Sequence, residues 1–175
     1  MINNKRILCT GGGGSIGSEI VRQLCPTNKV WILDQDETST FDLAEELTQK
    51  GHWVKYRVGD IRDKETVHDV FSDFKPQIVI NAAALKHVSP SQKYPREYVD
   101  TNIIGNLNVI EECKRWECFE KFVYISTDKA VANKKNVMGA TKMCSETITT
   151  TMGKEFVAVL FGNVLYSRGS VLEIW

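Results

Sequence analysis

The chain has 175 residues, a length that suits a single α/β domain. Hydrophobic residues make up 42% and charged residues 25%, a globular composition that excludes a disordered or fibrous protein. Lys and Arg together number 22, as do Asp and Glu, so the chain lacks the basic surplus that non-specific binding to nucleic acid or to an anionic membrane requires.

Targeting and metal-binding signals are also missing from the sequence. No apolar run approaches the roughly 18 residues that a membrane span needs, and the first six residues contain no secretory signal. The five cysteines are scattered without a C-x-x-C motif, and the three histidines lie far apart. We therefore predict a cytoplasmic protein with reduced thiols and no metal site.

Strand-like and helix-like segments alternate along the whole chain. Short β-rich runs predict strands at Arg6–Thr10, Val30–Asp34, Trp53–Val58, Ile78–Asn81, Lys121–Ser126 and Phe156–Phe161. Helical periodicity predicts helices at Ser15–Cys25, Thr38–Lys50, Lys64–Phe74, Arg96–Trp116 and Val137–Gly153. This alternation predicts an α/β fold, a doubly wound parallel sheet of about six or seven strands with helices on both faces. In such a sheet, ligands bind at the carboxyl edge where the strand order reverses.

A glycine-rich loop follows the first predicted strand and precedes the first predicted helix. Its sequence, Thr10-Gly11-Gly12-Gly13-Gly14-Ser15-Ile16-Gly17, fits both G-x-G-x-x-G and T-G-x-x-G-x-x-G. Glycines let the backbone approach a pyrophosphate closely, and the helix N-terminus presents N–H groups to it. The loop therefore predicts a Rossmann-like dinucleotide site formed by Gly11, Gly14, Ser15, Ile16 and Gly17.

An acidic residue ends the second predicted strand. Asp34 lies about 20 residues beyond the loop, where a carboxylate can accept hydrogen bonds from an adenosine ribose. The same carboxylate would repel a 2′-phosphate, and the next residues, Gln35, Asp36 and Glu37, include no Arg. We therefore predict NAD, rather than NADP, as the cofactor of a single domain spanning residues 1–175.

Beyond the glycine loop, the sequence resembles the extended short-chain dehydrogenase/reductases. Within them it is most similar to the nucleotide-sugar 4,6-dehydratases of bacterial polysaccharide biosynthesis, in the branch that acts on UDP-N-acetylglucosamine. The resemblance covers nearly the whole chain. It is carried by Thr10–Gly17, Gly59-Asp60-Ile61-Arg62-Asp63, Asn81-Ala82-Ala83-Ala84-Leu85-Lys86-His87-Val88, Ser126-Thr127-Asp128-Lys129-Ala130, Asn136–Lys142 and Phe161-Gly162-Asn163-Val164 with Ser167-Arg168-Gly169-Ser170.

The resemblance implies further cofactor-binding positions. Asp60 and Ile61 fall where the family holds the adenine, and Ala82, Ala83 and Ala84 would line the cofactor after the fourth strand. Asn102 matches a residue of the active-site helix. Lys142 matches the lysine that binds the nicotinamide ribose, and its charge would favour the departure of a hydride.

The resemblance also implies a three-stage reaction on the sugar. Carbon 4 is oxidised, water is lost across carbons 5 and 6, and carbon 6 is then reduced, so that the cofactor is regenerated. By this analogy Asp128 protonates the departing hydroxyl, Lys129 removes the carbon 5 proton, and Thr127 bonds near the 4-oxygen. The implied substrate-binding residues are Lys86, Thr127, Asn163, Val164 and Ser167.

Three positions depart from the pattern of the family. Met138 stands where the superfamily's Tyr-x-x-x-Lys motif has its tyrosine, and a thioether can neither ionise nor donate a proton. One branch of the dehydratases carries Met here. Asp128, Lys129 or Lys142 could take over the proton of the 4-hydroxyl group, and the sequence does not choose between them. Leu160 and Tyr166 replace the usual Arg and Gly near the nucleotide-sugar site.

Other functions remain open on the sequence alone. A nucleotide-sugar epimerase or ketoreductase would share the fold, although neither needs an acid and a base for the loss of water. An inactive NAD-binding fragment is the third alternative, because family enzymes continue into a C-terminal substrate lobe that we expect to be absent here. Family members self-associate through helices beside the sheet, so we predict a homo-oligomer.

Overall fold

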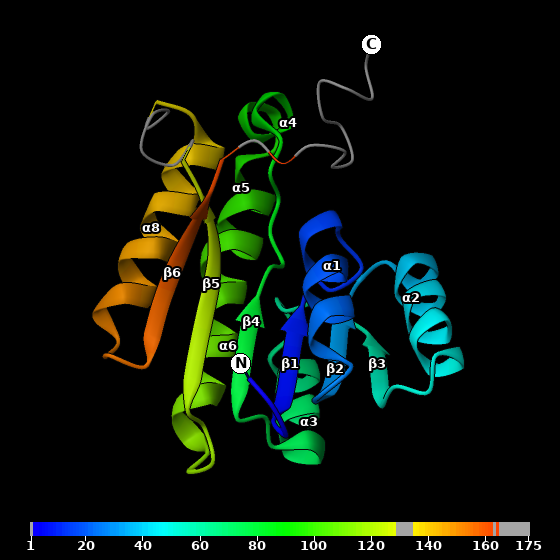
Figure 1. Ribbon diagram of the computed structural model, residues 1–175. Helices are drawn as coiled ribbons and strands as arrows, with labels where there is room; N and C mark the ends of the chain where they lie inside the picture. The colour runs from blue at the N-terminus through cyan, green and yellow to red at the C-terminus, as the bar shows by residue number, and fades with distance from the viewer. Residues whose placement is uncertain (1, 129–134, 163, 165–175) are drawn as a thin grey trace.

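A six-stranded, all-parallel sheet forms the centre of the protein (Figure 1). The structure, a computed structural model, describes residues 2–128, 135–162 and 164. The strands are β1 (Arg6–Thr10), β2 (Lys29–Asp34), β3 (Val54–Val58), β4 (Ile78–Asn81), β5 (Lys121–Thr127) and β6 (Phe156–Phe161). Their spatial order is β3-β2-β1-β4-β5-β6, so the predicted doubly wound Rossmann-like fold is confirmed.

The strand order reverses between β1 and β4. The chain runs outward from β1 through β2 to β3 and then crosses back, so that β4 pairs with the free side of β1. In this register Thr10 lies beside Asn81 on one side and beside Leu33 on the other. The glycine loop leaves β1 directly after Thr10, and it therefore lies at the reversal point where a ligand crevice is expected.

Helices cover both faces of the sheet (Figure 1). They are α1 (Ser15–Leu24), α2 (Glu37–Gln49), α3 (Lys64–Phe74), α4 (Val88–Lys93), α5 (Pro95–Tyr98), the π-helix η1 (Val99–Gly105), α6 (Asn106–Arg115) and α8 (Val137–Thr151). Side chains of α1 and α2 pack in one apolar cluster with Ile7 and Cys9 of β1. Leu8, the residue between them, joins the opposite cluster with α3 and α6. This alternation is what a strand buried on both faces produces.

The helix predicted at Arg96–Trp116 has a more complex form in the structure. It is divided into α5, the π-helix η1 and α6, which follow one another without a break. A π-helical turn holds one residue more than an α-helical turn and is frequent at functional sites. Here it contains Asn102, whose side chain bonds to two other segments, as described below.

Helix α4 was not predicted, because Ser89-Pro90-Ser91 resembles a loop. Pro90 occupies the third position of the helix, where the backbone N–H has no intrahelical partner to lose. Four of the remaining predicted elements have the predicted bounds, and the others differ from the structure by one or two residues at their ends; the four are Arg6–Thr10, Lys64–Phe74, Ile78–Asn81 and Phe156–Phe161. None of the helices in the described part of the chain has the length and apolar character to span a membrane.

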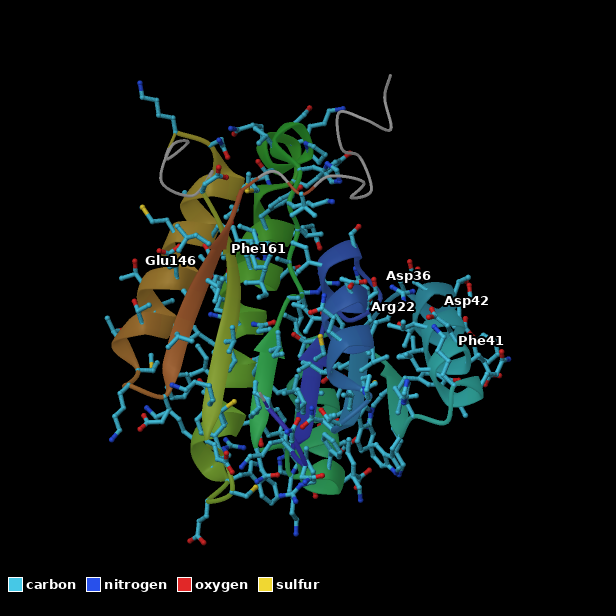
Figure 2. The ribbon with its side chains drawn as sticks, in the orientation of Figure 1. Arg22, Asp36, Phe41, Asp42, Glu146 and Phe161 are labelled. Atoms are coloured by element: carbon cyan, nitrogen blue, oxygen red, sulfur yellow. The ribbon has the colours of Figure 1, made fainter. Side chains whose placement is uncertain are left out.

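Two phenylalanines should differ clearly in how much they contribute to the free energy of unfolding. Phe71 on α3 is fully buried, whereas Phe41 on α2 is 47% exposed and contacts Tyr56 edge-on (Figure 2). Phe71→Ala should lower the free energy of unfolding by about 3–5 kcal/mol, because it leaves a cavity. Phe41→Ala is the control and should cost at most about 1 kcal/mol. Urea unfolding checks both, and equal costs would contradict the burial assigned to Phe71.

Candidate functional site

The glycine loop turns directly against the segment that follows β4. Gly11 has a φ of +69°, which favours glycine, and its N–H donates to Leu33 O over 2.8 Å. A Cβ placed on Gly11 would lie 2.4 Å from Ala83 N. A side chain at position 11 would therefore force the first βα loop away from the β4 loop.

A second glycine lets helix α1 rest on the loop. A Cβ on Gly17 would lie 2.1 Å from Gly11 O, a distance that real Cβ atoms do not tolerate. Helix α1 starts at Ser15 with Gly14 as its N-cap, and its first turn has no acidic residue, so no carboxylate there competes for an anion. Ile16 packs against the apolar cluster on the α1 and α2 face. The loop thus has the shape and the polarity of a phosphate-binding turn.

The carboxylate of Asp34 lies beside this loop. Its Oδ2 accepts from Gly13 N over 2.8 Å, and its Oδ1 accepts from Asp36 N over 3.0 Å. Each carboxylate oxygen has a second lone pair, so both can still accept from a ribose hydroxyl group. The buried Thr40 Oγ1 close behind Gly13 has no hydrogen-bond partner among the described residues.

The loop after β3 is held by an ion-pair network and by α6. Arg62 pairs with Asp60 at 2.6 Å and with Glu97 at 2.6 Å. Ile61 is buried against Gly105, and Asn108 Nδ2 donates to Ile61 O and Arg62 O over 2.9 and 3.1 Å. These contacts fix the backbone of this loop.

The segment after β4 has small, half-buried side chains. Ala82 N donates to Thr10 O over 2.9 Å, and Ala83 faces Gly11. Ala82, Ala83 and Ala84 are all partly exposed, while Lys86 farther along is exposed. This segment therefore packs directly against the glycine loop at the carboxyl edge of β1 and β4, where a ligand is expected to bind.

Asn102 in η1 connects the β4 loop to helix α8. Its Oδ1 accepts from Leu85 N over 2.8 Å, and its Nδ2 donates to Leu85 O over 3.1 Å and to Thr141 Oγ1 over 3.0 Å. Asn102 is 1% exposed, so these bonds lie inside the protein. In the structure its contacts are those of a residue that positions the β4 loop against α8.

A second chain of buried bonds reaches α8 from β1. Thr10 Oγ1 donates to Asn81 Oδ1, and Asn81 Nδ2 donates to Asn106 Oδ1 over 2.7 Å. Asn106 Nδ2 in turn donates to Thr149 Oγ1 over 3.2 Å. Asn81, Asn106 and Thr149 were not predicted as site residues. Asn81 begins one of the segments that carry the family resemblance, whereas Asn106 and Thr149 had no signal other than a polar residue at a buried position.

Lys142 on α8 is buried against β5. Its Nζ donates to Ile125 O over 2.9 Å and lies 4.8 Å from the centre of the Tyr124 ring. Burial lowers the pKa of this ammonium to about 8, and the negative charge of Glu146 opposes the shift. An amine with this pKa can change its protonation state near neutral pH.

Thr127 and Asp128 lie at the carboxyl end of β5. Thr127 Oγ1 donates to Asp128 Oδ1 over 3.2 Å, and Asp128 N donates to Phe161 O over 3.0 Å. Asp128 is exposed and can meet a substrate. Lys129, Asn163 and Ser167 lie outside the described residues, and Val164 is half-buried.

Met138 occupies the first turn of α8, close to Lys142 in sequence. It is 1% exposed, and its N–H donates to Ser91 Oγ over 3.2 Å. The thioether therefore packs inside the protein, where it contributes no proton. The helix itself begins with Asn136, whose Oδ1 accepts from Gly139 N over 2.8 Å.

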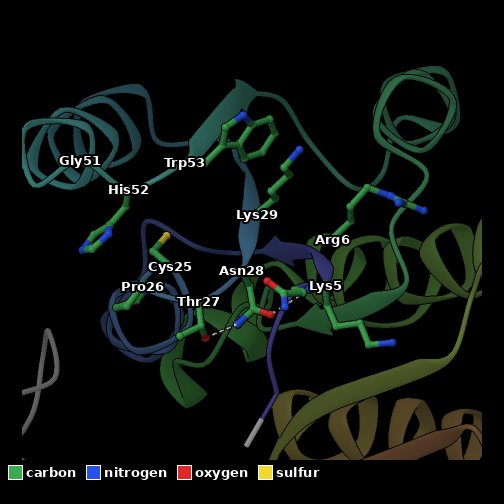
Figure 3. Close-up of a pocket in the computed structure, with 11 residues that line it drawn as sticks. Lys5, Arg6, Cys25, Pro26, Thr27, Asn28, Lys29, Gly51, His52 and Trp53 are labelled. Atoms are coloured by element: carbon green, nitrogen blue, oxygen red, sulfur yellow. Dashed lines mark hydrogen bonds between the residues drawn. The ribbon is translucent and has the colours of Figure 1, made fainter.

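A separate pocket of about 450 Å³ lies at the opposite end of the sheet (Figure 3). It is lined by residues at the amino ends of β1 and β2, including Lys5, Arg6 and Lys29. Lys5 pairs with Glu120, Arg6 Nε donates to Lys75 O, and Lys29 lies over the Trp53 ring. These cations already have partners, and the pocket is remote from the glycine loop.

The sequence matches a known protein family over most of its length. Residues 7–175 match the family model described as polysaccharide biosynthesis protein. The chain belongs to this family. It is 43% identical over 184 residues to capsular polysaccharide biosynthesis protein CapD of Staphylococcus aureus, with 99% of this chain covered. It is 37% identical over 185 residues to a UDP-N-acetylglucosamine 4,6-dehydratase (inverting) of Campylobacter jejuni, with 100% covered.

The chain spans only part of these relatives, 30% of CapD and 54% of the Campylobacter dehydratase. Solved structures share its fold, and two of them illustrate the match. Pen from Bacillus thuringiensis superposes with a TM-score of 0.89 at 34% identity, over 98% of this chain and 55% of Pen. A UDP-glucose 4-epimerase of Thermus thermophilus, solved in complex with NAD, has a TM-score of 0.70 at 30% identity, over 90% of this chain and 53% of the epimerase.

The burial of Lys142 predicts a specific pH dependence of stability. Since its pKa in the folded state, about 8, lies below the ordinary lysine pKa of 10.5, the unfolded chain binds the extra proton between these values. The free energy of unfolding should therefore rise with pH from about 8 to about 10.5, by up to about 1.4 kcal/mol per pH unit. Lys142→Met should lose this rise. Urea unfolding of both proteins across this range measures the difference, and identical slopes would contradict the buried ammonium.

Proposed function

We propose that this chain is the NAD-binding part of a nucleotide-sugar 4,6-dehydratase that acts on UDP-N-acetylglucosamine. The observation that carries the proposal is the Thr127–Asp128 pair at the carboxyl end of β5, which begins two residues beyond Ile125, the strand residue that accepts from Lys142. The 37% identity to a dehydratase named for this substrate supports the choice.

The residues at the crevice fit a dinucleotide. The backbone at Gly11 and Gly17 is packed so closely that no side chain fits there. The Asp34 carboxylate lies beside the glycine loop, where it could accept hydrogen bonds from a ribose. Gly11, Gly14, Ser15, Ile16 and Gly17 would hold the pyrophosphate, and Asp34 the adenosine ribose. Asp60 and Ile61 would hold the adenine, with Ala82, Ala83 and Ala84 along the crevice. When bound, NAD supplies the reversible hydride chemistry that oxidises carbon 4 and later reduces carbon 6.

Asn102 and Lys142 would serve the nicotinamide end of the crevice. Asn102 keeps the β4 loop in register with α8 through its bonds to Leu85 and Thr141. Lys142 would bind the nicotinamide ribose, and its ammonium would favour the oxidation of carbon 4 electrostatically. Its lowered pKa leaves part of the population neutral near pH 8.

The proton balance of the reaction suggests how the chain works without a tyrosine at position 138. Oxidation of carbon 4 releases a proton from the 4-hydroxyl group, and the loss of water from carbon 6 consumes one. The Asp128 carboxylate can accept the first proton and deliver it to the departing hydroxyl group, while Thr127 orients the 4-oxygen. Lys129, which follows Asp128 directly in the sequence, would remove the carbon 5 proton.

Substrate binding would depend on residues around the same edge. Lys86 is exposed on the β4 loop, where its positive charge suits a diphosphate. Val164, together with Asn163 and Ser167, would contact the nucleotide sugar after β6.

The role of Asp34 predicts the cofactor preference. The protein should bind NAD more tightly than NADP, because a 2′-phosphate would lie against the Asp34 carboxylate. Asp34→Ala should weaken NAD binding by about tenfold or more, and it should reduce the difference between the affinities for NAD and NADP. Asp42→Ala, an equal change of charge on an exposed position of α2 (Figure 2), is the control and should alter neither affinity. Calorimetric titration with each cofactor measures this, and tighter binding of NADP would contradict the assignment.

The dehydratase mechanism predicts a distinctive product. Incubation of the protein with NAD and UDP-N-acetylglucosamine in D₂O should give a 4-keto-6-deoxy sugar with deuterium at carbon 5, because that proton exchanges through the base. Asp128→Asn should lower the rate by about 100-fold or more, and Asp73→Asn, on the exposed face of α3, should leave it unchanged. Mass spectrometry and NMR identify the product. A 4-epimer without deuterium at carbon 5 would instead establish the epimerase reaction for which relatives in Rickettsia bellii, 30% identical, are named.

A further inference from the structure

The last buried residue of β5 is bonded to helix α8. Ser126 is 3% exposed, and its Oγ donates to Glu146 Oε2 over 2.7 Å. Successive side chains of a strand point to opposite faces, so Thr127 is directed away from this bond. The contact therefore fixes the strand immediately before the two residues proposed to act on the sugar.

Glu146 and Lys142 hold the same strand from one helix. Lys142 Nζ donates to Ile125 O, and Glu146 accepts from the next residue, Ser126. Lys142 and Glu146 are four residues apart on α8, so they lie on one face of the helix, one turn from each other. Figure 2 labels Glu146 on α8. Two consecutive residues of β5 are thus bonded to two consecutive turns of α8.

The same carboxylate is close enough to act on the lysine electrostatically. Among the described residues, the Tyr124 ring of β5 lies 4.8 Å from the Lys142 ammonium, and the charge of Glu146 on α8 acts on it electrostatically. Burial lowers the pKa of Lys142, and Glu146 raises it in part. A neutral residue at position 146 would leave the buried ammonium without this compensation.

We propose that Glu146 is a positioning residue of the candidate site, which fixes the end of β5 to helix α8 and supplies the negative charge that faces the Lys142 ammonium. The significance of this role for catalysis rests on the function proposed above, through Thr127, Asp128 and Lys142. The two parts of the role use different properties of one side chain, its hydrogen-bond acceptor and its charge. They can therefore be separated by substitution.

Three variants separate the two parts. Glu146→Gln removes the charge and keeps an oxygen that can accept from Ser126. Ser126→Ala removes the bond and keeps the charge, and Glu146→Ala removes both. Glu111→Gln on α6 is the matched control, because it removes the charge from an exposed glutamate that pairs with Lys64 at 3.2 Å.

NMR of the protein with ¹³C-labelled lysine measures the titration of Lys142, assigned from the signal that Lys142→Met removes. Glu146→Gln should shift the Lys142 midpoint to a lower pH than in the wild type, while Ser126→Ala and Glu111→Gln should leave it in place. Hydrogen exchange of the Thr127 and Asp128 amides should accelerate about tenfold or more in Ser126→Ala and Glu146→Ala, and remain at the wild-type rate in Glu146→Gln.

An unchanged Lys142 midpoint in Glu146→Gln, or unchanged amide exchange in Ser126→Ala, would overturn the proposal. Both measurements need neither cofactor nor substrate. A protein that shows both effects but forms no 4-keto-6-deoxy sugar would therefore refute the dehydratase function and leave the positioning role of Glu146 intact.

Discussion

The candidate site depends on the buried hydrogen bonds that join the first strand to the last described helix. Thr10, Asn81, Asn106 and Thr149 form one chain of donors and acceptors across the sheet and into α8. Each such bond contributes about 1 kcal/mol net, but a buried partner left without its bond costs about 1–3 kcal/mol. Because the network is connected, α8 has one favoured position relative to the glycine loop, and Lys142 is placed accordingly.

Residues with local signals could be predicted from the sequence. The glycine loop and Asp34 form a motif whose spacing predicts its local geometry, and the loop lies where β1 meets β4, at the reversal of the strand order. The strands were recognisable because each is a short β-rich run bounded by turns. The fold class follows from the alternation of these runs with helices.

Features that depend on distant contacts could not be predicted in this way. The π-helix at Asn102 reflects bonds to Leu85 and Thr141, which lie 17 and 39 residues away in the sequence. Ser126 and Glu146 have the same character, since neither residue carries a pattern that reveals its partner. Helix α4 was not predicted, because a proline usually indicates the end of a helix. Pro90 lies in the first turn of α4, where a proline is tolerated.

The pairing of β1 with β4 has a consequence for how the protein reaches its native state. Thr10 and Asn81 are 71 residues apart in the sequence, and two complete strand–helix units separate them. The ends of this long loop must meet before the glycine loop can pack against the segment after β4, and closing it costs entropy that only later contacts recover. In a nascent chain that has not yet reached β4, the glycine turn consequently lacks the Ala82–Ala83 backbone that supports it in the folded protein.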